Sequence, residues 1–291
     1  MINKEVRIAF FGNSDFSKIV LEELKKKGTV PELIVTTPDK PQGRKMVLTP
    51  TPTKVWAEEN GIEYIEPEKL KDESFLNKIK DYNLYIVASY GKIIPKVLID
   101  MPKYQVLNIH PSLLPKYRGP SPLQTQILNG EFPTKDESQK TGISIMLIDE
   151  QIDHGAIVAQ KDFYINTEVG FYRLQDICAK EGAELLTEIL PDWIKGNIKP
   201  QIQDDTKATF TKKIEKNDGF IDLNDNPYKN YLKILAYEEW PKAFFKINKN
   251  GKEMRVVITK ADWKDNKLEI LKVIPEGKKE MSYADFLRGM K

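Results

Sequence analysis

The sequence of 291 residues contains one cysteine, two histidines and no long apolar run. A single cysteine excludes an internal disulfide framework and any zinc or iron–sulfur site built from several thiolates. Because no apolar run reaches the roughly 18 residues of a membrane span, we expect no membrane partner. The first six residues lack the apolar region of a signal peptide, so we expect a cytoplasmic location.

The sequence also lacks the glycine motifs that bind phosphates. A buried strand predicted over 6–11 is followed by the turn 12–17, which has no second or third glycine of a dinucleotide fingerprint. No Gly-x-x-x-x-Gly-Lys-Ser/Thr sequence occurs elsewhere. The pattern therefore argues against a nicotinamide cofactor and against a P-loop.

Strands and helices alternate up to about residue 130, which predicts an α/β fold with a Rossmann-like, mainly parallel sheet and helices on both faces. Beyond Pro200 the pattern changes to one helix and several short strands. We expect a small β-rich, barrel-like C-terminal domain there, so the predicted domains are residues 1–203 and 204–291. The strands predicted in the second domain are Ala243–Ile247, Arg255–Lys260, Lys267–Val273 and Tyr283–Arg288.

The charges are distributed unevenly along the chain. Residues 206–291 carry 19 Lys and Arg against 13 Asp and Glu, whereas the remaining 205 residues carry 26 against 30. A mildly basic tail is typical of a polyanionic partner. A lysine-rich solvated surface with no partner gives the same count, so both interpretations stay open.

The stretch 38–52 is a long connection after a predicted strand. It shows no periodicity and combines prolines with Lys40, Arg44 and Lys45. Connections of this kind usually have 2–6 residues, and longer irregular ones are typically functional or disordered. We therefore expect a stiff, exposed, basic loop.

The stretch Gln105–Pro120 is central to the sequence. Polar and apolar residues alternate over 105–110, which predicts a strand, and the prolines that follow predict a loop. Asn108 and His110 share one face of this strand at its carboxyl end, where open α/β sheets place their chemistry. An isolated Asn-x-His is more often structural than catalytic, so the interpretation depends on the rest of the chain.

An acidic loop at 148–155 contains Asp149, Glu150, Asp153 and His154. It can be a solvated turn, a metal site, or the source of a carboxylate for His110. No His-x-x-x-His or Glu-x-x-His spacing supports a metal, so we expect none. Asp153 is favoured over Asp149 as the partner of His110, because Gly155 gives its end of the loop freedom to fold inward.

Asn108, His110 and Asp153 together suit acyl transfer to an amine. An amide N–H and an imidazolium can stabilise an oxyanion, and a carboxylate can help to remove the proton of the attacking amine. No activated serine or cysteine nucleophile is evident, and none is needed.

The run Asn-x-His-Pro-Ser-Leu-Leu-Pro-x-Tyr-Arg-Gly at 108–119, followed by Ile152-Asp153-x-Gly155, resembles the 10-formyltetrahydrofolate-dependent formyltransferases. Within this family the similarity is closest to the members that formylate initiator methionyl-tRNA. It extends over most of the chain, through the segments 11–16, 38–44, 90–95, 240–243 and 285–289.

The resemblance implies roles for individual residues. It assigns catalysis to Asn108, His110 and Asp153, and tRNA contact to Arg44 and Lys45. It implies that 10-formyltetrahydrofolate is the co-substrate, bound by two segments. The residues assigned to folate binding are Tyr90, Gly91, Ile93, Ile94, Ser112, Leu113, Leu114 and Pro115.

One departure from the family concerns tRNA contact, since Met46 and Val47 stand where relatives often carry lysines. The alternatives are a formyltransferase that acts on a sugar-nucleotide amine and a non-enzymatic RNA-binding protein on the same scaffold. The basic tail and the basic loop favour tRNA over a sugar. The complete Asn/His/Asp set argues against a non-enzymatic protein, and we expect a monomer.

Overall fold

The computed structural model describes residues 6–42, 46–130, 141–165, 169–249 and 251–290. The chain packs as two compact units. Unit 1 comprises residues 1–120, 142–162 and 175–210, and unit 2 comprises 121–141, 163–174 and 211–291. The second unit is thus assembled from three separate stretches of the sequence. The predicted division at 203/204 remains a sequence-based proposal.

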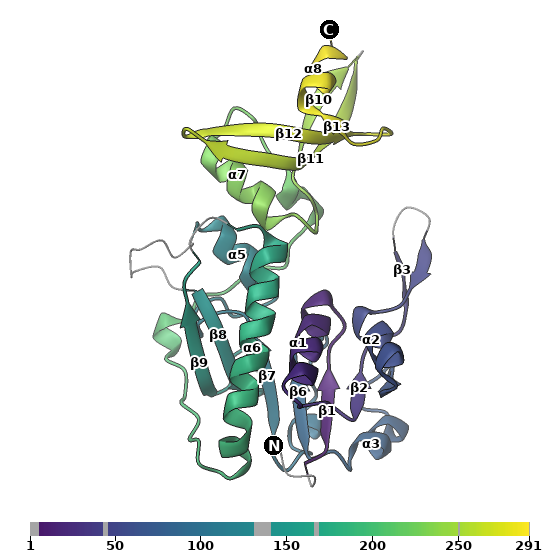
Figure 1. Cartoon of the computed structure of the whole chain (residues 1–291), viewed down its shortest axis with the longest axis vertical. Helices are drawn as coiled ribbons and strands as arrows, with labels where there is room; N and C mark the ends of the chain where they lie inside the picture. Colours follow the sequence, from purple (N-terminus) through teal and green to yellow (C-terminus); the bar gives the residue numbers. More distant parts are fainter. Residues whose placement is uncertain (1–5, 43–45, 131–140, 166–168, 250, 291) are drawn as a thin grey trace. The chain divides into compact units, whose positions relative to one another are not determined.

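A mixed sheet forms the centre of unit 1 (Figure 1). Its order is β5-β2-β1-β6-β7-β8-β9, and the pairs from β5 to β7 are parallel, whereas β8 runs antiparallel to β7. The mainly parallel sheet expected from the sequence is confirmed. The strands are β1 (Ile8–Phe11), β2 (Leu33–Val35), β5 (Glu63–Ile65), β6 (Leu84–Val87), β7 (Val106–His110), β8 (Thr141–Leu147) and β9 (Ile157–Phe163).

Helices cover both faces of this sheet, which is why β1 and β6 are buried throughout. Figure 1 shows two of them, α1 and α6, over one face. On the other face, α3 and α4 pack in the cluster that contains Ala9 and Phe11. The helices of unit 1 are α1 (Asp15–Lys26), α2 (Pro52–Asn60), α3 (Glu73–Ile79), α4 (Lys96–Ile99) and most of α6 (Phe171–Ile194).

Close contacts fix these helices on the sheet. Ser14 and Ser17 form a capping box at the start of α1, and the Ser17 hydroxyl also donates to the Ala88 carbonyl at 2.6 Å. Gly182 brings α6 onto β7, since a Cβ there would lie 2.5 Å from a methyl group of Ile109. The end of β7 is thereby held by the helix that covers it.

The connection after β2 is more ordered than the sequence suggests. Instead of an irregular loop it forms a short antiparallel hairpin of β3 (Lys40–Gln42) and β4 (Val47–Thr49). Three buried threonine hydroxyls, of Thr36, Thr51 and Thr53, bond to one another at its base. This network joins residues that are 15 and 17 positions apart on either side of the hairpin, contacts that sequence periodicity does not predict.

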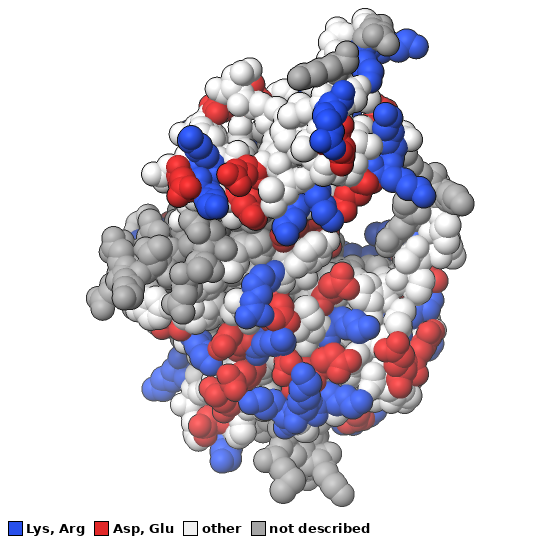
Figure 2. Space-filling model, turned by 45° about the horizontal axis from the view of Figure 1, so that its top comes forward, with Lys and Arg blue, Asp and Glu red and all other residues white. Residues whose placement is uncertain are grey.

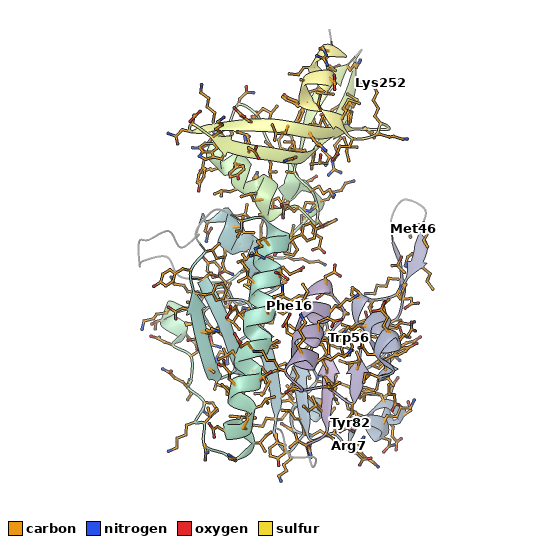
Figure 3. All side chains as sticks on the ribbon, viewed as in Figure 1. Arg7, Phe16, Met46, Trp56, Tyr82 and Lys252 are labelled. Atoms are coloured by element: carbon orange, nitrogen blue, oxygen red, sulfur yellow. The ribbon has the colours of Figure 1, made fainter. Side chains whose placement is uncertain are left out.

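Apolar side chains are exposed on this hairpin. Met46, Val47 and Leu48 are largely exposed, and Figure 3 shows Met46 on the hairpin, whereas Trp56 is buried in α2. Arg44 and Lys45, the residues assigned to tRNA contact, lie outside the described residues.

Unit 2 is built around an antiparallel sheet with the linear order β10-β11-β12-β13. The β-rich C-terminal part expected from the sequence is confirmed, and over the described residues its sheet is open and does not close into a barrel. Helix α5 packs against α7. The elements are α5 (Pro122–Leu128), α7 (Pro227–Ala236), β10 (Phe244–Lys249), β11 (Lys252–Lys264), β12 (Lys267–Pro275), β13 (Met281–Ser282) and α8 (Tyr283–Arg288).

The strand predicted over 283–288 is wrong, because this segment is helix α8. The Ser282 hydroxyl accepts from the Asp285 backbone N–H at 3.0 Å and caps the helix. Phe286 is buried against Phe245 in the core of the sheet. A cap and one buried aromatic residue thus determine a short helix whose hydrophobic pattern does not distinguish it from a strand.

The surface carries charges of both signs. On the face that Figure 2 shows, Lys and Arg side chains are interspersed with Asp and Glu. Within the described residues, no helix has the length and apolar composition needed to cross a membrane.

Glu238 lies at the amino end of α6, within unit 2. Its carboxylate accepts from the Tyr172 backbone N–H at 3.2 Å, and a Cβ on Gly170 would overlap it. Burial raises the pKa of the Glu238 carboxyl. The folded protein therefore keeps the Glu238 carboxyl protonated to a higher pH than the unfolded chain does. The free energy of unfolding should fall as the pH rises from the ordinary carboxyl pKa through the raised pKa of the folded state.

Urea unfolding of the wild type and of Glu238→Gln across pH 4–8 tests this expectation. The free energy of unfolding of the wild type should fall relative to that of Glu238→Gln as the pH rises. Glu239→Gln, at the exposed neighbouring position, is the control. A difference between the wild type and Glu238→Gln that is independent of pH contradicts the expectation.

Candidate active site

The carboxyl edge of the sheet in unit 1 has a topological switch point. The chain passes from β1 to β2 on one side, while β6 lies on the other side of β1. Open α/β sheets bind ligands at this kind of place. The loops that leave β6 and β7 at this edge carry most of the residues singled out in the sequence. Arg7 and Tyr82, which stack at 4.4 Å, mark the opposite, amino edge (Figure 3).

His110 ends β7 and is 4 % exposed. Its Nε2 lies 3.0 Å from the Tyr117 carbonyl oxygen. Because a carbonyl oxygen can only accept, Nε2 carries a proton in either charge state of the ring. Its Nδ1 lies 3.7 Å from Asp153 Oδ2. Nδ1 is therefore the ring nitrogen that faces the carboxylate.

Asp153 is held in a left-handed backbone conformation with φ +49°. Its Oδ2 accepts from the Gly119 backbone N–H at 2.8 Å, which keeps the side chain near His110. Asp149, the alternative weighed from the sequence, instead lies 2.6 Å from His154 Nδ1. The structure thus brings Asp153, and not Asp149, to His110.

Gly155 is required by a close approach. A Cβ at this position would overlap the Leu147 carbonyl oxygen at the end of β8. The acidic loop can therefore fold back onto β8 only with glycine here. This reason differs from the loop freedom inferred from the sequence, since it is the space for a Cβ, and not a positive φ, that demands the glycine.

Asn108 lies two residues before His110 on β7, opposite Met146 on β8, and is half-buried. Residues two apart in a strand share a face. The amide of Asn108 and the ring of His110 are therefore presented on the same side of the sheet, as the sequence predicts. The part that Asn108 plays in catalysis stays a prediction.

The segment Ser112–Pro115, assigned to folate binding, is fixed by Ser144 on β8. The Ser144 hydroxyl donates to the Ser112 carbonyl at 2.6 Å and accepts from the Leu114 N–H at 3.0 Å. Gln160 on β9 donates to the Leu114 carbonyl at 2.9 Å. Ser112 and Leu114 are buried, which leaves Leu113 and Pro115 as the more accessible side chains.

Ser144 and Gln160 were not expected from the sequence. The one available signal is Ser144 itself, a polar residue within the apolar strand 141–147. Its hydroxyl also accepts from Gln160 Nε2 at 2.8 Å, so its donor and two acceptor sites are all used. Such a saturated buried hydroxyl fixes the path of the loop next to it.

We expect Ser144→Ala to loosen the segment Ser112–Pro115. The Ser112 carbonyl and the Leu114 N–H lose their partner, which should reduce the free energy of unfolding by about 1–3 kcal/mol. If the segment binds folate, the KM for 10-formyltetrahydrofolate rises while kcat at saturation stays near the wild-type value. Denaturant unfolding and steady-state kinetics measure both effects.

Ser74→Ala, on the exposed face of α3, is the matched control and should change neither quantity. An unchanged KM in a destabilised Ser144→Ala protein contradicts the role in folate binding.

The second segment assigned to folate divides into buried and exposed residues. Tyr90 and Ile94 are buried in the core cluster that includes Phe11, so their side chains do not form a surface. Gly91, with φ +72°, and Ile93, which is 82 % exposed, are accessible. The described residues contain no group of three or more His, Cys, Asp and Glu side chains placed to hold a metal ion.

Comparisons with known proteins identify the family of the chain. Residues 6–190 match the family model described as formyl transferase. Among curated relatives, methionyl-tRNA formyltransferase of Bacillus velezensis is 35 % identical over 308 residues, covering 97 % of this chain and 94 % of the relative. The enzyme of the same name from Bacillus subtilis is 33 % identical, also over 308 residues, covering 97 % and 94 %.

Solved structures share the fold. Methionyl-tRNA formyltransferase from Clostridium thermocellum has a TM-score of 0.60 at 18 % identity, covering 95 % of this chain and 99 % of that chain. An N-formyltransferase from Helicobacter canadensis, in complex with folinic acid and dTDP-3-aminofucose, has a TM-score of 0.62 at 18 % identity, covering 89 % and 88 %. The chain therefore belongs to the formyl transferase family, and within it to the methionyl-tRNA formyltransferases.

Proposed function

We propose that this protein transfers the formyl group of 10-formyltetrahydrofolate to the amino group of methionine on initiator methionyl-tRNA, in support of translation initiation. The observation that carries the proposal is the pairing of buried His110 with Asp153, at 3.7 Å, on the strand edge that also presents Asn108. Curated methionyl-tRNA formyltransferases that match over nearly the whole chain support the same reaction.

The described residues fit a folate co-substrate. Exposed Ile93 beside Gly91 offers apolar surface and an open backbone, and the segment Ser112–Pro115 is rigidly held. The Helicobacter canadensis relative was solved with folinic acid. 10-Formyltetrahydrofolate supplies an activated formyl carbon. The protein has to stabilise the negative charge that forms on the formyl oxygen and to remove a proton from the attacking amine.

Three side chains meet these requirements in the proposed mechanism. The Asn108 amide and the His110 ring donate to the formyl oxygen as it becomes negative. Asp153 stabilises the charged imidazole ring and takes the proton that the attacking amine loses, directly or through a water. A new C–N bond to methionine forms, the bond to the folate nitrogen breaks, and the proton passes to that nitrogen.

For the tRNA substrate, the proposal rests on the relatives and on Arg44 and Lys45, which lie outside the described residues. Contacts to phosphates add affinity and dependence on salt without selecting a sequence. A cytoplasmic location and a monomeric state remain predictions of the sequence.

The test is to incubate the purified protein with 10-formyltetrahydrofolate and either methionyl initiator tRNA or an amino-sugar nucleotide. We expect formylmethionine on the tRNA and no transfer to the sugar. Formylation of the sugar alone would replace the proposal with a sugar-nucleotide formyltransferase. Binding of tRNA without any transfer would leave a non-enzymatic RNA-binding protein.

A further inference from the structure

Residues 203–209 follow α6 in the sequence and belong to unit 1. They lie against two loops of the candidate active site, the acidic loop 148–155 and the loop that follows β7. Gln203 is 6 % exposed. Its Nε2 donates to the Asp153 carbonyl at 2.9 Å and to the Gly155 carbonyl at 2.8 Å. One side chain therefore bridges the acidic loop on both sides of His154, next to the carboxylate that faces His110.

Arg118 determines which way the Gln203 amide points. Its Nε donates to Gln203 Oε1 at 3.0 Å, and its Nη2 donates to Asp205 Oδ1 at 2.7 Å. A guanidinium only donates, so the amide oxygen of Gln203 must face Arg118 and the NH2 group must face the two carbonyls. The orientation of the amide thus follows from chemistry, and Arg118 itself is 3 % exposed.

The acidic loop needs the hydrogen bonds from Gln203 because Asp153 has φ +49°. A non-glycine residue in the left-handed region is disfavoured unless its surroundings determine it. Two contacts do so: Gln203 bonds the Asp153 backbone, and the Gly119 N–H bonds its carboxylate. Gly119 directly follows Arg118, so the same loop bonds both the Gln203 amide and the Asp153 carboxylate.

The same segment also supports His110. The Thr209 hydroxyl accepts from the Tyr117 N–H at 2.8 Å, and the Thr209 carbonyl accepts from the Arg118 N–H at 2.9 Å. Tyr117, at φ +64°, provides the carbonyl that holds His110 Nε2. Residues 203–209 therefore contact both the backbone of Asp153 and the loop whose Tyr117 carbonyl holds His110.

We infer that Gln203 is a positioning residue for formyl transfer, whose amide fixes the acidic loop so that Asp153 faces His110. The inference rests on the proposed function. Gln203 does not touch the reacting atoms, and it acts through the Asp153 backbone. Small displacements of a catalytic group lower the rate of the chemical step by up to about 10²-fold and need not weaken substrate binding.

The test compares Gln203→Met with Gln201→Met in the full-length protein. Gln203→Met keeps the size of the side chain and removes its three hydrogen bonds, whereas Gln201 is exposed two residues away. For Gln203→Met we expect kcat for methionyl-tRNA formylation to fall by about 10- to 100-fold with both KM values unchanged. Gln201→Met should match the wild type.

Gln203→Glu is the second variant, for the case in which Gln203→Met does not fold. It keeps an acceptor for Arg118 but places an oxygen against the Asp153 and Gly155 carbonyls. We expect a folded protein with the same fall in kcat. Combining Gln203→Met or Gln203→Glu with Asp153→Asn should lower kcat little further than Asp153→Asn alone, because both changes remove one function.

A wild-type kcat in a folded Gln203 variant overturns the inference, as does a rise in KM without a fall in kcat. Effects of Gln203 and Asp153 changes that multiply also overturn it. These outcomes differ from failure of the proposed function, in which the wild type does not formylate methionyl-tRNA or His110→Gln is fully active.

Discussion

His110→Gln is expected to lower kcat by about 10²- to 10³-fold, the loss found when one oxyanion partner is removed. The glutamine NH2 group can still donate to the Tyr117 carbonyl, which His110 Nε2 holds at 3.0 Å, so the buried site keeps this hydrogen bond. What disappears is the ring nitrogen that lies beside Asp153. Single-turnover formylation by the purified variant measures the loss.

The control is His154→Gln, which changes the other histidine of the chain. His154 is half-buried beside Asp149 and makes no described contact with His110. It should retain most of the activity, and circular dichroism should show both variants folded. A folded His110→Gln with near-wild-type turnover would remove His110 from the mechanism.

Asp153→Asn is expected to reduce kcat by about 10²-fold, within the range for loss of one acid–base group. The asparagine oxygen can still accept from the Gly119 N–H, so the side chain stays in place. Its NH2 group, however, carries no charge and cannot take a proton from the amine or stabilise a charged His110. The shape of the site is thus preserved while its chemistry is removed.

Asp149→Asn makes the same change in the same loop and is the matched control. Asp149 pairs with His154 and is more exposed than Asp153. Parallel measurements of kcat and of both KM values should show a large loss of kcat for Asp153→Asn only. Equal losses in the two variants would mean that the loop, and not the Asp153 carboxylate, matters.

The sequence predicts the parts of this protein that depend on local patterns. The alternation of strands and helices predicts the sheet of unit 1, and the period of two in β7 places Asn108 and His110 on one face. The sequence favours Asp153 over Asp149 as the partner of His110, and Asp153 is the residue that lies near it. The sheet and the shared face of Asn108 and His110 are determined by neighbours in sequence, which a pattern can indicate.

The remaining features depend on partners far apart in the sequence. Gln203 meets Asp153 across 50 residues and Arg118 across 85, and no period in the sequence connects them. Buried threonines bond to one another on either side of the hairpin of β3 and β4, and α8 buries Phe286. Tertiary contacts of this kind override local propensity.

The support that Thr209 gives to Tyr117 has a consequence for the newly synthesised chain. Thr209 follows Tyr117 by 92 residues, and ribosomes add about 5–20 residues per second. For several seconds the nascent chain thus contains His110 and its loop without the segment that holds them. Translation has to pass the whole of α6 before this enzyme, itself proposed to serve the start of translation, can assemble its own active site.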